Sequence, residues 1–378
     1  ETFGRNPRWD RIAQFAALRT DGRLNPVDDP IVLYGRISPD YLPCPEACLI
    51  TGLTPKKTAD GLVEADLAAE IHAQMSVPGT CTVGFNSLRF DDEFIRNLLY
   101  RNFYDPYRRE YAAGNSRWDI LPLVRLAHDL RPEGIEWVYD EAGKPIFRLE
   151  ELTAANGLEH EHAHDALSDV EATRAIAALI RDKQPKLYDF YLGLRRKDEV
   201  RRIVNLQHRQ PVLYNSPLFT RSEGTTSVVL PITVNPRNGN EILAFDLRFD
   251  PQLLFESNEE ELRRRVFTSR EELAGEERIP LVGIPVNKAP AVAPLSTLQA
   301  DQAQRLGLAI TEIEARAGAI AARLDEDPGL AARIRAIYQE GGMTAYRDPD
   351  LNIYSGGFFG DEDRAVFEQI HVTPPEEL

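Results

Sequence analysis

The residues that could do chemistry gather first in the segment His164-Asp165-Ala166-Leu167-Ser168-Asp169, where a histidine precedes a carboxylate by five positions at the start of a predicted helix. A histidine exchanges protons at neutral pH, whereas a carboxylate binds cations. Two more carboxylates, Glu1 and Asp91, stand where predicted strands end. Three separated carboxylates and one imidazole therefore predict a hydrolytic site that uses a metal.

Metal-assisted cleavage of a phosphodiester is the chemistry that fits these residue types. The reaction adds negative charge to an anionic phosphate, and two divalent cations, about 3.5–4 Å apart, absorb this charge and acidify the attacking water. Mg²⁺ prefers oxygen ligands and keeps several waters, so carboxylates from separate segments suffice. We predict that Glu1, Asp91 and Asp169 bind two Mg²⁺ ions, with Mn²⁺ as an alternative. His164 would then take the proton from the water.

The motifs around these residues resemble those of the DEDDh exonucleases. That family has Asp-x-Glu-Thr first, then Asn ahead of Phe-Asp, then His-Asp-Ala-x-x-Asp, and these positions carry Glu1, Asp91, His164 and Asp169. Longer strings resemble the bacterial exodeoxyribonuclease I group within the family. They are Ala13-Gln14-Phe15-Ala16-Ala17, Leu49-Ile50-Thr51-Gly52-Leu53-Thr54-Pro55, Arg101-Asn102-Phe103-Tyr104-Asp105-Pro106-Tyr107 and Asn115-Ser116-Arg117-Trp118-Asp119.

The first motif of the family begins with an aspartate that would stand two positions before residue 1. Residues two apart in a strand point to the same face, so that aspartate and Glu1 would bind metal jointly. We therefore expect the printed chain to hold three of the four carboxylates of the family. A polypeptide that truly started at Glu1 would be strongly impaired.

The resemblance implies an α/β fold in three parts. These are a ribonuclease H-like exonuclease domain with a mixed five-stranded sheet over residues 1–185, an SH3-like β-rich domain with a helical segment over 186–340, and the beginning of a C-terminal helical domain over 341–378. The sequence itself changes character after Gln184-Pro185, because strand and helix signals alternate before it and short β-like runs between turn clusters follow it. Periodicity alone does not select this fold.

The resemblance also implies the activity, which is 3′–5′ degradation of single-stranded DNA to 5′-mononucleotides in DNA repair. It places Thr2 and Phe3 near the terminal nucleotide, with Asn86 as a further candidate. Basic residues interleaved with aromatic rings suit a groove for a single strand, and Arg117 and Tyr104 belong to such a stretch. For each residue taken separately, a solvated helix face or a core contact is an equally good interpretation.

Two other functions stay open. The first is a DEDDh ribonuclease that trims RNA 3′ ends, and the exodeoxyribonuclease-like strings and the β-rich second part count against it. The second is a catalytically dead single-strand-binding or recruitment module. The missing aspartate favours the second, whereas the retained residues oppose it, namely Glu1, Asp91, His164 and Asp169.

The net charge of −16 taken alone argues against binding to nucleic acid, because non-specific binding normally draws on clustered lysine and arginine. Local charge differs from this average. Six basic residues oppose three acidic ones over 186–202, and residues 101–117 are also rich in arginine. Tyrosines accompany both stretches, including Tyr188 and Tyr191 in the first. We therefore keep a single-strand groove as the expectation.

Composition sets the class and the compartment. At 378 residues, with 43% hydrophobic and 28% charged residues, the chain is an ordinary globular protein of several domains. We see no apolar run of about 18 residues, so we expect no membrane span. Three cysteines, Cys44, Cys48 and Cys81, are an odd number that favours free thiols in a reducing compartment. We expect a cytoplasmic monomer.

A protein partner is also implied by the resemblance, since members of the family dock the acidic C-terminal tail of single-stranded DNA-binding protein. Such a tail needs a basic pocket with an apolar floor. Lys288 or Arg305, beside Pro290, Leu295 and Leu306, could contribute to one.

Overall fold

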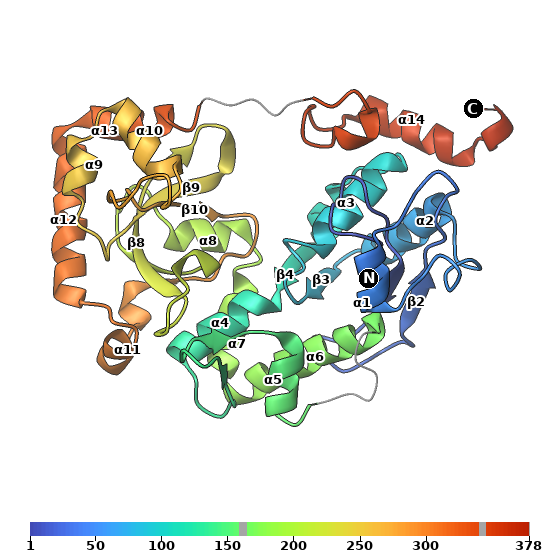
Figure 1. The fold of residues 1–378 in the computed structure, drawn as a ribbon, viewed down its shortest axis with the longest axis horizontal. Helices are drawn as coiled ribbons and strands as arrows, with labels where there is room; N and C mark the ends of the chain where they lie inside the picture. The colour runs from blue at the N-terminus through green and yellow to red at the C-terminus, as the bar shows by residue number, and fades with distance from the viewer. Residues whose placement is uncertain (159–164, 340–344, 378) are drawn as a thin grey trace. The chain divides into compact units, whose positions relative to one another are not determined.

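The computed structural model describes residues 1–158, 165–339 and 345–377, which fold into two compact units (Figure 1). His164 lies outside the described residues. The first unit comprises Glu1–Ile120, Arg148–Leu179 and Met343–Leu378, and the second comprises Leu121–Phe147 and Ile180–Gly342. The C-terminal segment thus packs with the N-terminal part of the chain. The three-part division suggested by the sequence stays a prediction.

The strands of the first unit are short. Strand β1 (Gln14–Ala17) pairs antiparallel with β2 (Ile31–Tyr34), and β3 (Cys81–Gly84) runs parallel to β4 (Ser116–Asp119). Single bridges add further pairings, such as that of Thr2 with Ile12. Over the described residues these pairings do not form the continuous five-stranded ladder that the resemblance implied, because β1 pairs only with β2 and β3 only with β4 in separate two-stranded ladders. The expected α/β organisation is confirmed.

Helices cover the first unit through apolar faces. In α2 the residues Leu67, Ile71 and Met75 recur at helical spacing, and they pack against Leu98 and Leu99 of α3 in one buried cluster. This contact fixes the helix whose first residue is Asp91. The helices of this unit are α1 (Pro45–Thr51), α2 (Glu64–Met75), α3 (Asp91–Arg101), α5 (Leu149–Ala155), α6 (Ala166–Lys183, which ends in the second unit) and α14 (Asp361–Val372).

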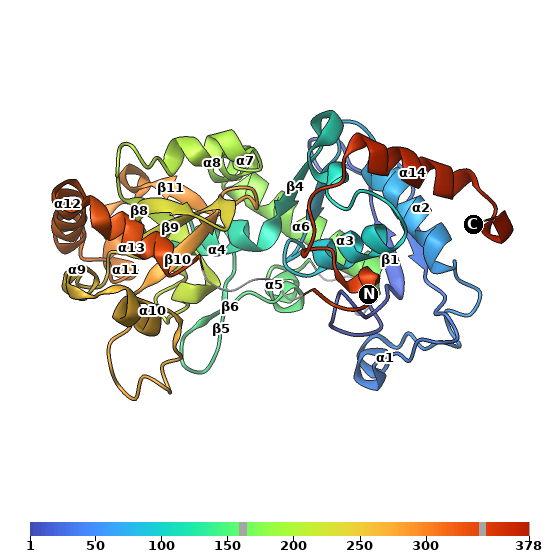
Figure 2. The same ribbon diagram turned by 90° about the horizontal axis from the view of Figure 1, so that it is seen from above.

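The second unit is built on a five-stranded antiparallel sheet of order β10-β9-β8-β7-β11, whose strands lie side by side in Figure 2. The ladder between β8 and β9 shifts register next to Pro231, which has no N–H to donate. The strands are β7 (Val212–Asn215), β8 (Thr226–Asn235), β9 (Asn238–Asp246), β10 (Leu281–Pro285) and β11 (Val292–Pro294).

Several helices of the second unit pack against this sheet or against one another. Helix α13 contacts both α12 and β8, and α8 contacts β11. The remaining elements are α4 (Ile120–Leu130), β5 (Val138–Tyr139), β6 (Pro145–Ile146), α7 (Pro185–Gly193), α8 (Lys197–Ile203), α9 (Gln252–Glu256), α10 (Glu259–Phe267), α11 (Ala300–Arg305), α12 (Ile310–Glu326) and α13 (Pro328–Ala336).

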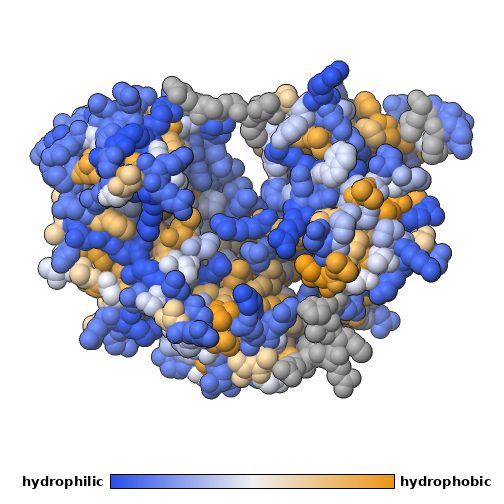
Figure 3. Space-filling model, in the orientation of Figure 1, coloured by the Kyte–Doolittle hydropathy of each residue, from blue (hydrophilic) through white to orange (hydrophobic). Residues whose placement is uncertain are grey.

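The surface and the burial of two tyrosines bear on predictions made from the sequence. Hydrophilic residues predominate on the face shown in Figure 3. Tyr188 and Tyr191 of α7 are buried, so the core contact is correct for them and a stacking surface is not. None of the described helices combines the length and the apolar character needed to cross a membrane.

Candidate active site

Asp91 is delivered by the turn that joins β3 to α3. Because β3 and β4 are parallel, their carboxyl ends lie side by side, with Gly84 opposite Asp119. The buried carboxylate of Asp119 accepts the backbone N–H of Asn86 at 2.8 Å and that of Leu88 at 3.2 Å. Asn86 has φ 60°, a left-handed conformation that asparagine adopts more readily than most residues. Asp119 therefore fixes the turn that leads into Asp91.

The surroundings of Asp91 disfavour its charge. Loss of hydration raises the pKa of this carboxyl to about 6, and the charges of Asp92 and Asp119 add to the rise. The Asp91 residue is nevertheless exposed at the surface. A carboxylate that is accessible yet largely surrounded by protein would gain from a bound cation.

Gln14 links Glu1 to the start of α6. The backbone nitrogen of Glu1 donates to the Gln14 carbonyl at 2.7 Å, and the Gln14 backbone N–H donates to the Glu1 carbonyl at 3.1 Å. The buried Gln14 side chain donates to Asp165 Oδ1 at 2.6 Å and accepts the N–H of Ala166 at 3.4 Å. Asp169 lies in the first turn of this helix. Gln14 therefore brings Glu1 and Asp169 into the same region.

The donor set of this region suits a hard divalent cation. Glu1, Asp91 and Asp169 supply only carboxylate oxygens, and the raised pKa of Asp91 marks a carboxylate whose charge is under-compensated. Across the residues that the structure describes, no three His, Cys, Asp or Glu side chains form a ready-made metal site. Since the catalytic candidate His164 is not described, the assignment of Glu1, Asp91, Asp169 and His164 stays a prediction.

The candidates for nucleotide binding next to Glu1 have different surroundings. Phe3 is 1% exposed and packs with Ala13 and Tyr41 in a small core. The Thr2 hydroxyl donates to the Gly4 carbonyl at 2.6 Å. Asn86, by contrast, is exposed at the turn before Asp91. Contact of Thr2, Phe3 or Asn86 with a nucleotide stays a prediction.

Arg117 and Tyr104 are both engaged by other protein groups. Arg117 is buried and forms ion pairs with Asp92 at 2.7 Å and Glu110 at 2.9 Å. The Tyr104 ring stacks on His72, with centroids 4.4 Å apart, and on His371, at 4.1 Å. These contacts show that both side chains stabilise the fold. Their predicted contact with substrate stays a prediction.

Comparisons with known proteins bear on this architecture. A family model described as "Exonuclease" matches residues 1–177, and one described as "Exonuclease I SH3-like domain" matches residues 195–340. Exodeoxyribonuclease I of Escherichia coli is 41% identical over 384 residues, which cover 100% of this chain and 79% of the relative. This chain belongs to the exodeoxyribonuclease I family. The Haemophilus influenzae member is 40% identical, over 100% of this chain and 80% of its own.

Solved structures of the exodeoxyribonuclease I family match the whole chain. E. coli Exonuclease I in complex with a dA16 oligonucleotide has a TM-score of 0.95 at 40% identity, covering 100% of this chain and 80% of its own. A moderately thermophilic Exonuclease I from Methylocaldum szegediense has a TM-score of 0.93 at 46% identity, with 100% and 79% covered. These matches confirm the predicted ribonuclease H-like and SH3-like parts and the exonuclease class.

Three residues of the site were missed or misjudged by the sequence interpretation. Asp119 ends one of the strings that resemble the family, so a signal for it was present. Gln14 also lies in one of these strings, but nothing local predicted its bonds to both Glu1 and Asp165. Asp92 was not among the predicted site residues, and it is buried in ion pairs with Arg109 and Arg117.

Proposed function

We propose that this protein is a metal-dependent 3′–5′ exonuclease that degrades single-stranded DNA to 5′-mononucleotides. Membership of the exodeoxyribonuclease I family over the whole chain carries the proposal. Solved E. coli relatives in complex with dA16 and dT13 oligonucleotides support single-stranded DNA as the ligand. A role in DNA repair is part of this proposal.

The metal is proposed to be a pair of Mg²⁺ ions, with Mn²⁺ as an alternative. A zinc-bound form of the E. coli relative supports a divalent cation in general. Bound here, the ions would supply Lewis acid stabilisation of the phosphate and acidify a water. Glu1, Asp91 and Asp169 would hold them through carboxylate oxygens. The raised pKa of Asp91 supports this role, because a nearby cation favours its ionised form.

The other residues are assigned to positioning and proton transfer. His164 would accept the proton of the attacking water, a task that suits a side chain titrating near neutral pH. Asp119 holds the turn before Asp91, and Gln14 holds Glu1 next to α6. Thr2 and Asn86 would lie beside the terminal nucleotide.

The test is digestion of matched DNA and RNA oligonucleotides by the full-length protein, with Mg²⁺ and with a chelator. We expect the 5′-labelled DNA strand to shorten from its 3′ end, with release of 5′-mononucleotides only when metal is present. Faster loss of RNA would favour the ribonuclease alternative. DNA binding without any release of nucleotides would favour the recruitment module.

A partner and a location complete the proposal. The acidic tail of single-stranded DNA-binding protein would meet Arg305, whose guanidinium lies over the end of α4 with Nη1 3.3 Å from the His128 carbonyl, beside the buried Leu306. A tail peptide that binds equally well after Arg305→Ala would remove this site. Among the described residues, Cys44, Cys48 and Cys81 form no disulfide, and the proposed location is the reducing cytoplasm. Size-exclusion chromatography tests the proposed monomer.

A further inference from the structure

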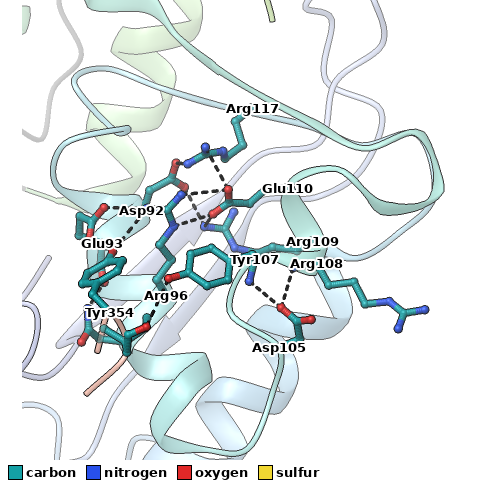
Figure 4. A network of polar contacts seen from close by, with 12 residues as sticks. Asp92, Glu93, Arg96, Asp105, Tyr107, Arg108, Arg109, Glu110, Arg117 and Tyr354 are labelled. Carbon is teal, nitrogen blue, oxygen red and sulfur yellow. Dashed lines mark hydrogen bonds and ion pairs between the residues drawn. The ribbon is translucent and has the colours of Figure 1, made fainter. Parts of the chain in front are cut away.

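A buried cluster of charges surrounds the residue that follows Asp91. The Asp92 carboxylate accepts from Arg109 at 2.8 Å through one oxygen and from Arg117 at 2.7 Å through the other (Figure 4). Arg117 comes from β4, whereas Arg109 comes from the 3₁₀ turn Arg108–Glu110. The first turn of α3 is thus tied to two other segments by one side chain.

Glu110 connects the same elements a second time. It accepts two hydrogen bonds from Arg96 of α3, at 2.7 and 3.0 Å, and pairs with Arg117 at 2.9 Å. The side chains of Asp92, Glu110 and the arginines that they bind are at most 8% exposed. Buried ion pairs keep their geometry because any movement leaves a charge without a partner. The cluster therefore acts as a rigid brace on α3.

The C-terminal segment reaches this brace through one hydroxyl group. The Tyr354 hydroxyl donates to Glu93 of α3 and accepts from Arg96 Nη1 at 3.4 Å (Figure 4). Arg96 also lies over the ring of Tyr107, 5.1 Å from its centroid. Residues 345–377 thus share a hydrogen-bond network with the helix that begins at Asp91.

We propose that the charge cluster of Asp92, Arg96, Arg109, Glu110 and Arg117 is a positioning element for metal binding at Asp91, and that Tyr354 completes it. The cluster fixes the direction of the first turn of α3, so the adjacent carboxylate is presented in one orientation. This inference rests on the proposed function, because Asp91 is a ligand only if the protein is a metal-dependent nuclease. Groups that orient metal ligands contribute strongly to metal affinity in other proteins.

The first experiment compares Tyr354→Phe with Tyr346→Phe in the full-length protein. Both changes delete one hydroxyl from the same C-terminal segment. Tyr346, however, is exposed, and among the described residues its hydroxyl is hydrogen-bonded only to Arg8. We expect Tyr354→Phe to raise the Mg²⁺ concentration for half-maximal activity several-fold without changing KM for the oligonucleotide. Tyr346→Phe should match the wild type. An unchanged Mg²⁺ requirement in Tyr354→Phe would overturn the proposed role of Tyr354 in the positioning element.

The second experiment tests the cluster itself through Asp92→Asn. Mn²⁺ binding followed by electron paramagnetic resonance should weaken by about tenfold, with the variant still folded by circular dichroism. Wild-type Mn²⁺ affinity in a folded Asp92→Asn would overturn the inference. Should that variant fail to fold, Glu110→Gln takes its place under the same criterion. Wild-type protein that binds Mn²⁺ but releases no nucleotide would instead contradict the proposed function, so the two failures are distinguishable.

Discussion

Asp119 accepts a hydrogen bond from the backbone N–H of Asn86 at 2.8 Å, and this bond ties the end of β4 to the turn that leads into α3. Asp119 itself has no place among the predicted metal ligands. It acts on them indirectly, because it holds the turn that ends at the predicted ligand Asp91. Under the proposed function, the position of the predicted ligand Asp91 therefore depends on a buried residue that is not itself a predicted ligand.

Replacing Asp119 by asparagine tests this dependence. The amide can accept only one of the two N–H groups that the carboxylate now accepts, so we expect a loss of about 1–3 kcal/mol in the free energy of unfolding and a reduced kcat. Urea denaturation and oligonucleotide digestion measure both. Asp21→Asn is a matched control, because Asp21 accepts two backbone N–H groups in an exposed loop. Equal behaviour of the two variants would refute the role of Asp119.

Asp91→Asn should alter the pH dependence of stability in the metal-free protein. The pKa of Asp91 is raised from 3.8 to about 6 in the fold. The stability that the protonated carboxyl contributes is therefore fully present below about pH 3.8 and is lost as the pH rises through about 6. Asparagine does not ionise, so the variant does not lose this stability as the pH rises. At pH 7.5 in a chelator we expect it to be more stable than the wild type by at most about 1 kcal/mol, since solvent screens an exposed carboxylate.

Urea denaturation at pH 4.5 and pH 7.5 measures that difference, with Asp60→Asn as an exposed control. Nuclease activity should be lost at the same time. A variant that is less stable at pH 7.5 than the wild type would show that the Asp91 charge is favoured in the metal-free fold.

His164→Ala should lower kcat by about 100- to 10,000-fold if this histidine takes the proton from the attacking water. His160→Ala and His162→Ala are close controls in the same stretch of sequence, and we expect both to keep near-wild-type rates. Rates of nucleotide release at saturating Mg²⁺ and DNA distinguish the three variants. Comparable losses in all three would point to a shared structural effect instead.

Asp129 provides a stability prediction for the second unit. It is fully buried, with Oδ1 2.7 Å from the His128 ring Nδ1, and it accepts from the Thr225 N–H at 2.9 Å and the Thr226 hydroxyl at 2.6 Å. Asp129→Ala leaves these donors without this partner, so we expect the free energy of unfolding to fall by about 3–5 kcal/mol. Thermal unfolding measures the change, and Asp140→Ala on an exposed turn is the control. A loss below about 1 kcal/mol would contradict this account.

The sequence predicted those features that depend on neighbouring residues. The short β-like runs that the sequence predicted after Gln184-Pro185 correspond to strands β7 to β10. The strand pattern placed Asp91 where a strand ends, and in the structure Asp91 follows β3 after a turn. Both kinds of feature are local, because caps, turns and periodic faces are set within a few residues.

Long-range polar contacts could not be predicted in this way. Asp92 finds its partners 17 and 25 residues away in Arg109 and Arg117, and Gln14 finds Asp165 at a separation of 151 residues. No periodicity records such pairings, which depend on how strands and helices come together. The same limit left Tyr188 undecided between a stacking surface and a core contact, since an aromatic ring suits both.

The central claim is that Asp91 and Asp169 bind divalent metal together, and anomalous diffraction from Mn²⁺-soaked crystals of the full-length protein tests it most directly. We predict two Mn²⁺ ions about 3.5–4 Å apart, both next to the carboxylates of Asp91 and Asp169. Mn²⁺ bound elsewhere, with Asp91 facing only water in an active enzyme, would contradict the account.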